Sequence, residues 1–376
     1  MNAYLGSVTM AVANHLWQST IVIGAAWLLT LMLRTNTART RQRIWIAASL
    51  KFLLPFSLLV AAGSHLVHPK PTAQSSPAFY TAMDEWAQPT PALAAAVQLG
   101  PMGPSASGKK QSVVWNAVPM MLAVVWLCGF AAIVSLWSVR WRRLKRMLRA
   151  SIPMPEGRET MALWRVQQRN GTCSAIRLMQ VRRQTGRRME PGVMGVRRQV
   201  LLWPDGISER LSDAQLETIL AHEMQHVKHK DNLAALLHMA VEAIFWFHPL
   251  VWWMETRLVE ERERACDEEV LRMGNKPGVY AQSILKTCEF CLESPMACVA
   301  GVTGGELKKR IAQIMSRRLG RELSLTKKVL LATAAVLVAA GPLVFGHWML
   351  IVYSELWATK NIGICAWIGE SVTISN

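Results

Sequence analysis

The stretch LSDAQLETILAHEMQHVKHKD, residues 211–231, decides what the rest of the chain is built around. Ser212 is followed three residues later by Gln215, which is the spacing of a capping box at a helix start. Apolar residues then recur at helical spacing, beginning with Leu216 and Ile219. The stretch therefore predicts an amphipathic α-helix that begins directly after Ser212.

Two histidines and a glutamate lie on this predicted helix in the string HEMQH, residues 222–226. Residues four apart share a helix face, so His222 and His226 can bind one metal ion while Glu223 lies beside it. This arrangement is typical of zinc hydrolases, in which the glutamate takes a proton from the metal-bound water. We expect a zinc site with Glu223 as general base, and we expect His229 to be a surface residue rather than a ligand.

A catalytic zinc site needs a third protein ligand. The downstream segment VEERERACDEEVL, residues 259–271, offers several carboxylates. Glu263 and Asp267 are one helical turn apart, so one can bind the metal while the other hydrogen-bonds a ligand histidine. Spacing alone does not select Glu263 over its neighbours, which are Glu260, Glu261, Glu268 and Glu269.

Further motifs accompany the metal motif. They are HLWQST at 15–20, LKFLLPFSLL at 50–59, FWFHPLVWWM at 245–254 and GGELKKRIAQIM at 304–315. With HEMQHVKHKDN and ERERACDEEVL, they resemble the BlaR/MecR-type family of membrane-embedded zinc metallopeptidases over roughly residues 10–345. The resemblance implies that His222, His226 and Glu263 bind zinc, that Glu223 is the general base, and that Asp267 orients a ligand.

The resemblance also implies a function. In that family an external signal passes through the membrane spans and switches on the protease, which cleaves itself and inactivates a cytoplasmic transcriptional repressor. We therefore expect a signal-transducing zinc endopeptidase with a peptide or repressor protein as partner, and a homodimer is compatible with this interpretation. Antibiotic-sensing members continue into an extracellular penicillin-binding domain, whereas this sequence ends at Asn376, so we expect no β-lactam acylation site in it.

Two alternative functions stay open. One is a constitutive quality-control protease in the membrane. The other is a non-proteolytic receptor or scaffold that retains a zinc site, which an intact Glu223 disfavours because a structural site needs no general base.

The composition indicates a membrane protein, because 51% of the residues are hydrophobic and 18% are charged. A membrane-spanning helix needs about 20 apolar residues. Basic clusters lie at 34–43, 140–146 and 327–328, and the positive-inside rule places them in the cytoplasm. We therefore predict a protein of the inner (plasma) membrane with four transmembrane helices. Two lie in 1–66 (apolar at 9–33 and 44–66), the third at 113–139 and the fourth at 329–352. Between and after them we expect an extracytoplasmic linker at 67–112, a cytoplasmic metalloprotease domain at 140–328 and an extracytoplasmic tail at 353–376.

A fifth apolar run at 233–254 is also long enough to span a membrane. If it crossed once, Glu263 would emerge on the opposite side from His222 and His226, and one zinc ion could not bind all three. Pro249 interrupts the run. We therefore predict a helix–Pro–helix hairpin that packs on the protease core or dips partway into the inner leaflet.

The formal net charge of +17 raises the question of nucleic-acid binding. Residues 140–200 hold most of the excess of basic over acidic residues. A cytoplasmic segment beside anionic lipid shows the same pattern. No aromatic platform or recognition helix accompanies the basic residues, so we expect a lipid bilayer as partner and no direct nucleic-acid contact.

Short β-type runs precede the zinc helix: AIRLMQV at 175–181, GVMGV at 192–196 and RQVLLWP at 198–204. They predict a small strand layer beside the helices, and an edge strand there can pair with an extended peptide substrate. The fold class we expect is a multi-pass α-helical membrane protein with a cytoplasmic α+β zincin-like (HExxH gluzincin) metalloprotease domain.

Overall fold

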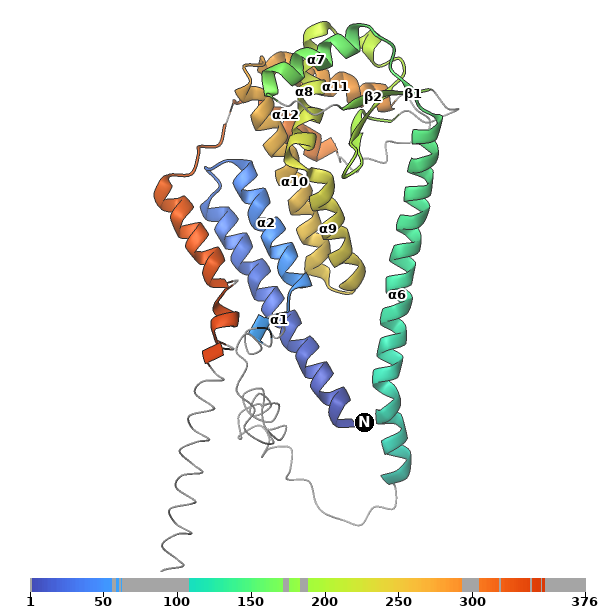
Figure 1. Cartoon of the computed structure of the whole chain (residues 1–376), viewed down its shortest axis with the longest axis vertical. Helices are drawn as coiled ribbons and strands as arrows, with labels where there is room; N and C mark the ends of the chain where they lie inside the picture. The colour runs from blue at the N-terminus through green and yellow to red at the C-terminus, as the bar shows by residue number, and fades with distance from the viewer. Residues whose placement is uncertain are drawn as a thin grey trace, which may run out of the picture. The chain divides into compact units, whose positions relative to one another are not determined.

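The structure is a computed structural model of the chain. It describes residues 2–55, 59–60, 62, 108–171, 176–182, 189–292, 304–317, 319–338, 340–345 and 347–348. These residues are mainly helical (Figure 1) and belong to two units. One unit consists of 22–50 and 125–323 and holds all the candidate site residues; the other consists of 1–21, 51–124 and 324–376.

Three helices in the described ranges are long and apolar enough to cross a membrane. They run over Ala11–Met32 in α1 (Asn2–Met32), over Met120–Ala150 in α6 (Gly108–Ala150), and over Leu325–Phe345. The second predicted span begins in α2 (Ala38–Leu53), and most of its remainder lies outside the described residues. In α6 the basic cluster at 140–146 continues the helix of the third predicted span.

The strands form one four-stranded sheet in the order β1-β2-β4-β3. β2 (Arg177–Val181) pairs in parallel with β4 (Val200–Pro204), whereas β1 (Ile152–Pro153) and β3 (Gly192–Met194) pair antiparallel with β2 and β4. The three β-type runs predicted from sequence are confirmed, and β1 is an addition to them. β4 is buried along its whole length because it lies inside the sheet, and β3 forms an edge.

Helices cover this sheet and build the core around α8 (Asp213–His229). The capping box is confirmed, because the Gln215 N–H donates to Ser212 Oγ and the Ser212 N–H donates to Gln215 Oε1 at 3.1 Å. A short turn, η1 (Ser208–Arg210), leads into the helix. α8 is surrounded by α7 (Arg158–Asn170), α10 (Pro249–Arg272) and α11 (Pro277–Leu292), and α12 (Gly304–Met315) packs on α10 and α11.

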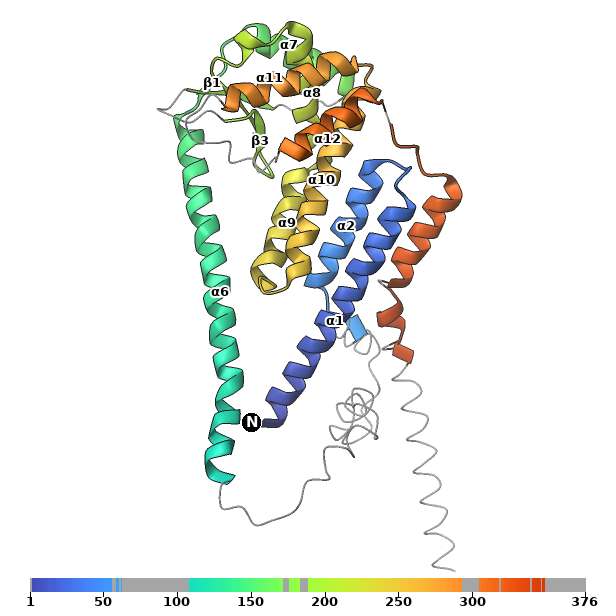
Figure 2. The same cartoon turned by 180° about the vertical axis from the view of Figure 1, so that it is seen from behind.

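The predicted helix–Pro–helix hairpin is confirmed. α9 (Asp231–Ile244) ends at a turn, and α10 begins with Pro249 in its first turn, where no intrahelical N–H is required. The hairpin lies beside α2 (Figures 1 and 2), and Trp45 and Trp253 meet edge to face between them at 5.3 Å. Because the chain turns back here, α10 packs against α8, and its acidic residues lie near that helix.

The tip of the hairpin contacts α6. The Trp126 indole N–H donates to the Ile244 carbonyl at 2.8 Å, and the Trp246 indole N–H donates to the Trp126 carbonyl at 3.2 Å. A Cβ on Gly129 would lie only 2.1 Å from the Trp246 ring, so this close approach requires glycine.

Candidate metal centre

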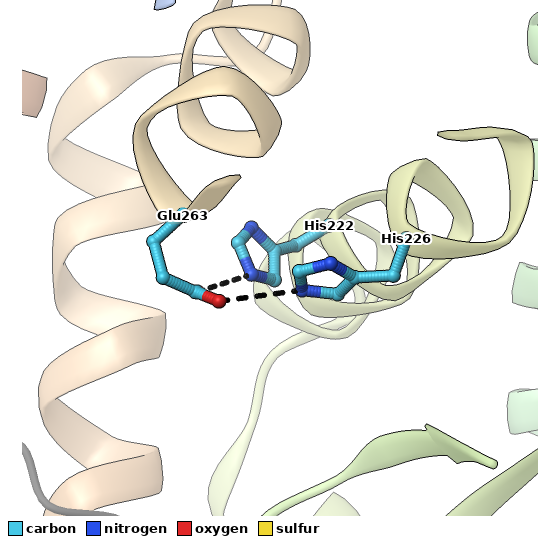
Figure 3. A group of neighbouring side chains, drawn as sticks. All are labelled: His222, His226 and Glu263. Carbon is cyan, nitrogen blue, oxygen red and sulfur yellow. Dashed lines mark ion pairs between the residues drawn. The ribbon is translucent and has the colours of Figure 1, made fainter. Parts of the chain in front are cut away.

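Three potential ligands meet at one point (Figure 3). His222 and His226 come from α8, and Glu263 comes from α10. His222 Nε2 lies 3.3 Å from Glu263 Oε2, and His226 Nε2 lies 3.8 Å from Glu263 Oε1. The three donor atoms all lie within 4.8 Å of one another. The structure therefore brings together two residues one helical turn apart and a third that is 37 positions further along the chain.

These distances fit a zinc ion. Zinc–ligand bonds of about 2.0–2.1 Å in a tetrahedral site place the donor atoms about 3.3 Å apart. The observed separations are close to that value, and the two imidazole rings stand at 89° with centroids 4.9 Å apart, so both can present a nitrogen to one ion. Two imidazoles and one carboxylate are also a donor set that zinc accepts while leaving a position open.

The charges at the site favour a cation. Burial disfavours charge on His222, but its contacts with Asp267 and Glu263 outweigh this and raise its pKa to about 9. Glu263 is also buried, yet the neighbouring histidines and arginines hold its pKa well below the usual range. In the metal-free protein the histidine proton balances these carboxylates, and a divalent cation would displace it.

None of the four neighbouring glutamates on α10 that the sequence left open contacts His222 or His226 among the described contacts. Glu261 pairs with Arg41 of α2, and Glu268 accepts the backbone N–H of Ala38. The ion-pair partners of the remaining two are Arg257 and Arg264 for Glu260, and Lys228 for Glu269. The geometry thus selects Glu263, which spacing alone left open.

The far nitrogen of His222 meets a carboxylate and a phenol. Asp267 Oδ1 lies 3.3 Å from His222 Nδ1, and the Tyr280 hydroxyl lies 2.8 Å from the same nitrogen. Tyr280 also donates to Asp267 at 2.5 Å, so the two side chains surround the imidazole edge together. The sequence analysis singled out Asp267 but not Tyr280, which lies on a different helix and carries no spacing signal relative to the motif.

Arg310 of α12 closes this side of the site. Its guanidinium binds both oxygens of Asp267, at 2.7 and 2.8 Å, and Nη2 lies 3.3 Å from His222 Nε2. The same cation lies 3.5 Å from Glu263. Although Asp267 is buried, Arg310 and His222 hold its pKa near 2, so it stays ionised. Arg310 is part of the GGELKKRIAQIM motif, but its place at the centre required the tertiary structure.

His226 has its own carboxylate partner, which the sequence analysis did not single out. Asp231 Oδ2 lies 2.9 Å from His226 Nδ1. The chain makes this contact because Lys230 adopts a left-handed conformation (φ 55°) that ends α8 and starts α9 one residue before Asp231. Asp231 is 2% exposed, and its contact with His226 lowers its pKa despite burial.

His226, Asp231 and Cys266 form a second potential metal-binding group. It shares His226 with the first group and uses the opposite ring nitrogen, Nδ1, which Asp231 already contacts. Burial raises the pKa of the Cys266 thiol well above its usual value, which opposes the thiolate that a metal needs. We therefore interpret this group as support for His226.

Glu223 lines a cavity of about 260 Å³ beside the ligands. Its side chain makes no hydrogen bond to any described residue, and burial raises its pKa, which strengthens it as a base. The edge strand β3 also lines this cavity, through Gly192 and Val193. The Asn232 side chain donates to the carbonyls of Val193 and Gly195, and this contact ties β3 to the start of α9.

Comparisons with known proteins identify the family of this chain. The family model for the BlaR1 peptidase M56 matches residues 10–314. The methicillin resistance MecR1 protein of Staphylococcus aureus (strain Mu50) is 33% identical over 98 residues, which are 26% of this chain and 17% of that protein. The regulatory protein BlaR1 of Bacillus licheniformis is 28% identical over 148 residues, which are 38% of this chain and 24% of that protein.

The matched segments thus span at most 24% of the length of these curated relatives. The family match, in contrast, covers most of the chain and includes α8, α10 and the arginine of α12. The chain belongs to the BlaR1 peptidase M56 family.

Proposed function

We propose that this protein is a membrane-embedded zinc endopeptidase that transduces a signal. The observation that carries the proposal is the meeting of His222, His226 and Glu263 beside the carboxylate of Glu223 in one cavity. A purely structural zinc site has four protein ligands and no base beside it. Three ligands and a base are the requirements of a hydrolase.

In the proposed mechanism His222, His226 and Glu263 hold zinc. When bound, zinc supplies Lewis-acid polarisation of the peptide carbonyl and lowers the pKa of the attacking water. Glu223 removes a proton from that water and transfers it to the leaving amine. Burial and the raised pKa of Glu223 suit this exchange, since the carboxyl must first accept the proton and then release it.

Side chains behind the ligands keep them in position. Asp267 and Tyr280 hold the imidazole of His222, and Asp231 holds that of His226. Such contacts set which ring nitrogen faces the metal. Arg310 pairs with Asp267, and its guanidinium also lines the cavity, where its N–H groups can face the negative charge that develops during peptide hydrolysis.

An extended peptide is the proposed substrate. It would lie in the cavity alongside β3, whose outer edge adjoins the ligands. Main-chain pairing with an edge strand binds a peptide without demanding a particular side chain. This geometry is compatible with cleavage of the chain itself and of a cytoplasmic repressor protein.

The proposed topology places residues 140–328 in the cytoplasm and the α9–α10 hairpin partly within the membrane. Support comes from the contact of the hairpin tip with Trp126, thirteen residues before the predicted membrane boundary at Val139. At 1.5 Å per residue, this corresponds to a depth of about 20 Å along α6. The hairpin would then enter and leave on the same side, which keeps all three ligands in one compartment.

The relatives are a methicillin resistance protein and a regulatory protein, which favours regulation over constitutive quality control. A test compares wild-type membranes with those containing the Glu223→Gln variant and labels new N-termini. Discrete cleavage sites in one or a few proteins, absent with Glu223→Gln, are expected. Many sites in misfolded membrane proteins would support the quality-control alternative, and identical labelling with both proteins would refute proteolysis.

A further inference from the structure

The first turn of α2 contacts the carboxylate that supports His226. The Gln42 side-chain amide donates to Asp231 Oδ1 at 3.1 Å, and Arg39 donates to the same oxygen at 3.4 Å. The other oxygen of Asp231 is the one that contacts His226 Nδ1. A continuous chain of hydrogen bonds therefore leads from α2 through Asp231 to a proposed zinc ligand.

This chain of contacts is shielded from water. Gln42 and Asp231 are each 2% exposed. Arg39 also donates to Gln42 Oε1 at 2.8 Å, which turns the amide so that its NH2 group faces Asp231. A second amino group of Arg39 reaches the His229 carbonyl at the end of α8, where a cation is favourable. Arg39 thus fixes the orientation of the Gln42 amide, and only in this orientation do both its oxygen and its NH2 group have hydrogen-bond partners.

The same turn of α2 is also attached to α10, the helix of the third proposed ligand. Glu268 accepts the first backbone N–H of α2, that of Ala38, at 3.2 and 3.3 Å. Arg41 forms a buried ion pair with Glu261 at 2.9 Å. Glu261 and Glu268 lie before and after Glu263 on α10, so the start of α2 contacts the elements that carry the proposed ligands.

We infer that Gln42 and Arg39 are positioning residues of the zinc site, acting on His226 through Asp231. The inference rests on the proposed zinc peptidase function and extends it to regulation. α2 follows the apolar helix α1 after a short turn, so a displacement of α2 that breaks the Gln42–Asp231 contact frees the His226 imidazole to rotate. The membrane helices then control how well the site holds zinc.

The test uses the full-length protein in detergent and metal ions as probes, so it needs no substrate. Gln42→Met keeps the size of the side chain and removes the donor, and Arg39→Ala removes the second donor. Loss of an outer hydrogen-bond partner typically weakens metal binding by about 10- to 100-fold, so we expect a zinc dissociation constant raised about tenfold in each variant. Cobalt(II) in place of zinc should show a shifted absorption spectrum because the imidazole has moved.

Arg43→Ala is the matched control. Arg43 is an exposed basic residue on the same turn and makes no contact with Asp231 in the described structure, so zinc affinity and the cobalt spectrum should match wild type. A double-mutant cycle separates positioning from general destabilisation. If Gln42 acts through Asp231, then Gln42→Met should add little to Asp231→Asn.

Wild-type zinc affinity and cobalt spectra in both Gln42→Met and Arg39→Ala would overturn the inference, as would full additivity with Asp231→Asn. A failure of the proposed function looks different. In that case His222→Ala and His226→Ala would retain zinc, or wild-type protein would bind none.

Discussion

The Tyr280 hydroxyl lies 2.8 Å from Nδ1 of His222 and donates to Asp267 at 2.5 Å, so a phenol connects a proposed ligand and its carboxylate. Burial and the neighbouring Asp267 raise the Tyr280 pKa well above its usual value, and the hydroxyl therefore stays a donor.

Tyr280→Phe should weaken zinc binding by about tenfold, because His222 loses one of its two partners at Nδ1. The fold should survive, since the ring still fills the core and Arg310 still binds Asp267. Chelator competition measures the affinity, and circular dichroism checks the fold. Unchanged affinity in a folded variant would mean that Asp267 alone orients His222.

Substitutions of the proposed ligands and of the proposed base should have different effects. His222→Ala, His226→Ala and Glu263→Ala should each strip zinc from the purified protein, whereas Glu223→Gln should keep zinc and abolish proteolysis. Elemental analysis together with a cleavage assay measures both. Full zinc occupancy in Glu263→Ala would contradict the assignment of Glu263 as the third ligand.

The stability of the fold should fall in mild acid because of His229. This residue lies at the end of α8 and is partly buried, and burial together with Arg39 lowers its pKa from 6.5 to about 4. Between these two values the unfolded chain binds a proton that the folded chain does not, so stability decreases as the pH falls from 6.5 to about 4.

His229→Gln should flatten this part of the pH dependence. Thermal unfolding midpoints of the zinc-free protein in detergent, recorded across that pH window, measure the effect. A wild-type slope in the variant would assign the acid sensitivity to another group.

Because Gly129 lies so close to the hairpin tip, a larger residue at this position should lower the stability of the fold. Gly129→Leu should push Trp246 away from α6, since its Cβ would overlap the indole ring, and overpacking of this kind costs about 1–3 kcal/mol. Gly24→Leu is the control, because a Cβ at Gly24 meets no atom within 4 Å. The thermal unfolding midpoint and tryptophan fluorescence should change with the first substitution and stay constant with the second.

The topology prediction is tested with a reporter that is active only outside the cytoplasm. Fused near residue 90 or at the C-terminus, it should be active, and near residue 155 or 275 it should be silent. Activity at 275 together with silence at 155 would mean that residues 233–254 cross the membrane, and the single metal centre would then be untenable.

Short sequence patterns predicted several structural features of this protein. The capping box at Ser212 and Gln215 and the paired histidines at 222 and 226 depend only on the geometry of one helix, so their spacing predicts their arrangement. The helix–Pro–helix hairpin followed from a compartment argument, because separated ligands cannot share an ion. The strand runs ahead of α8 were likewise apparent from their β-type composition and the turn-like stretches between them.

Only the tertiary structure decided which distant groups meet. Six glutamates lie on α10, and Glu263 alone among them contacts His222 and His226, because the hairpin fixes how that helix is rotated against α8. Tyr280 and Arg310 reach His222 from two further helices. Gln42 reaches Asp231 across 189 positions of sequence. A helix period relates residues within one or two turns, whereas contacts between helices depend on packing, which the spacing of residues along the chain does not encode.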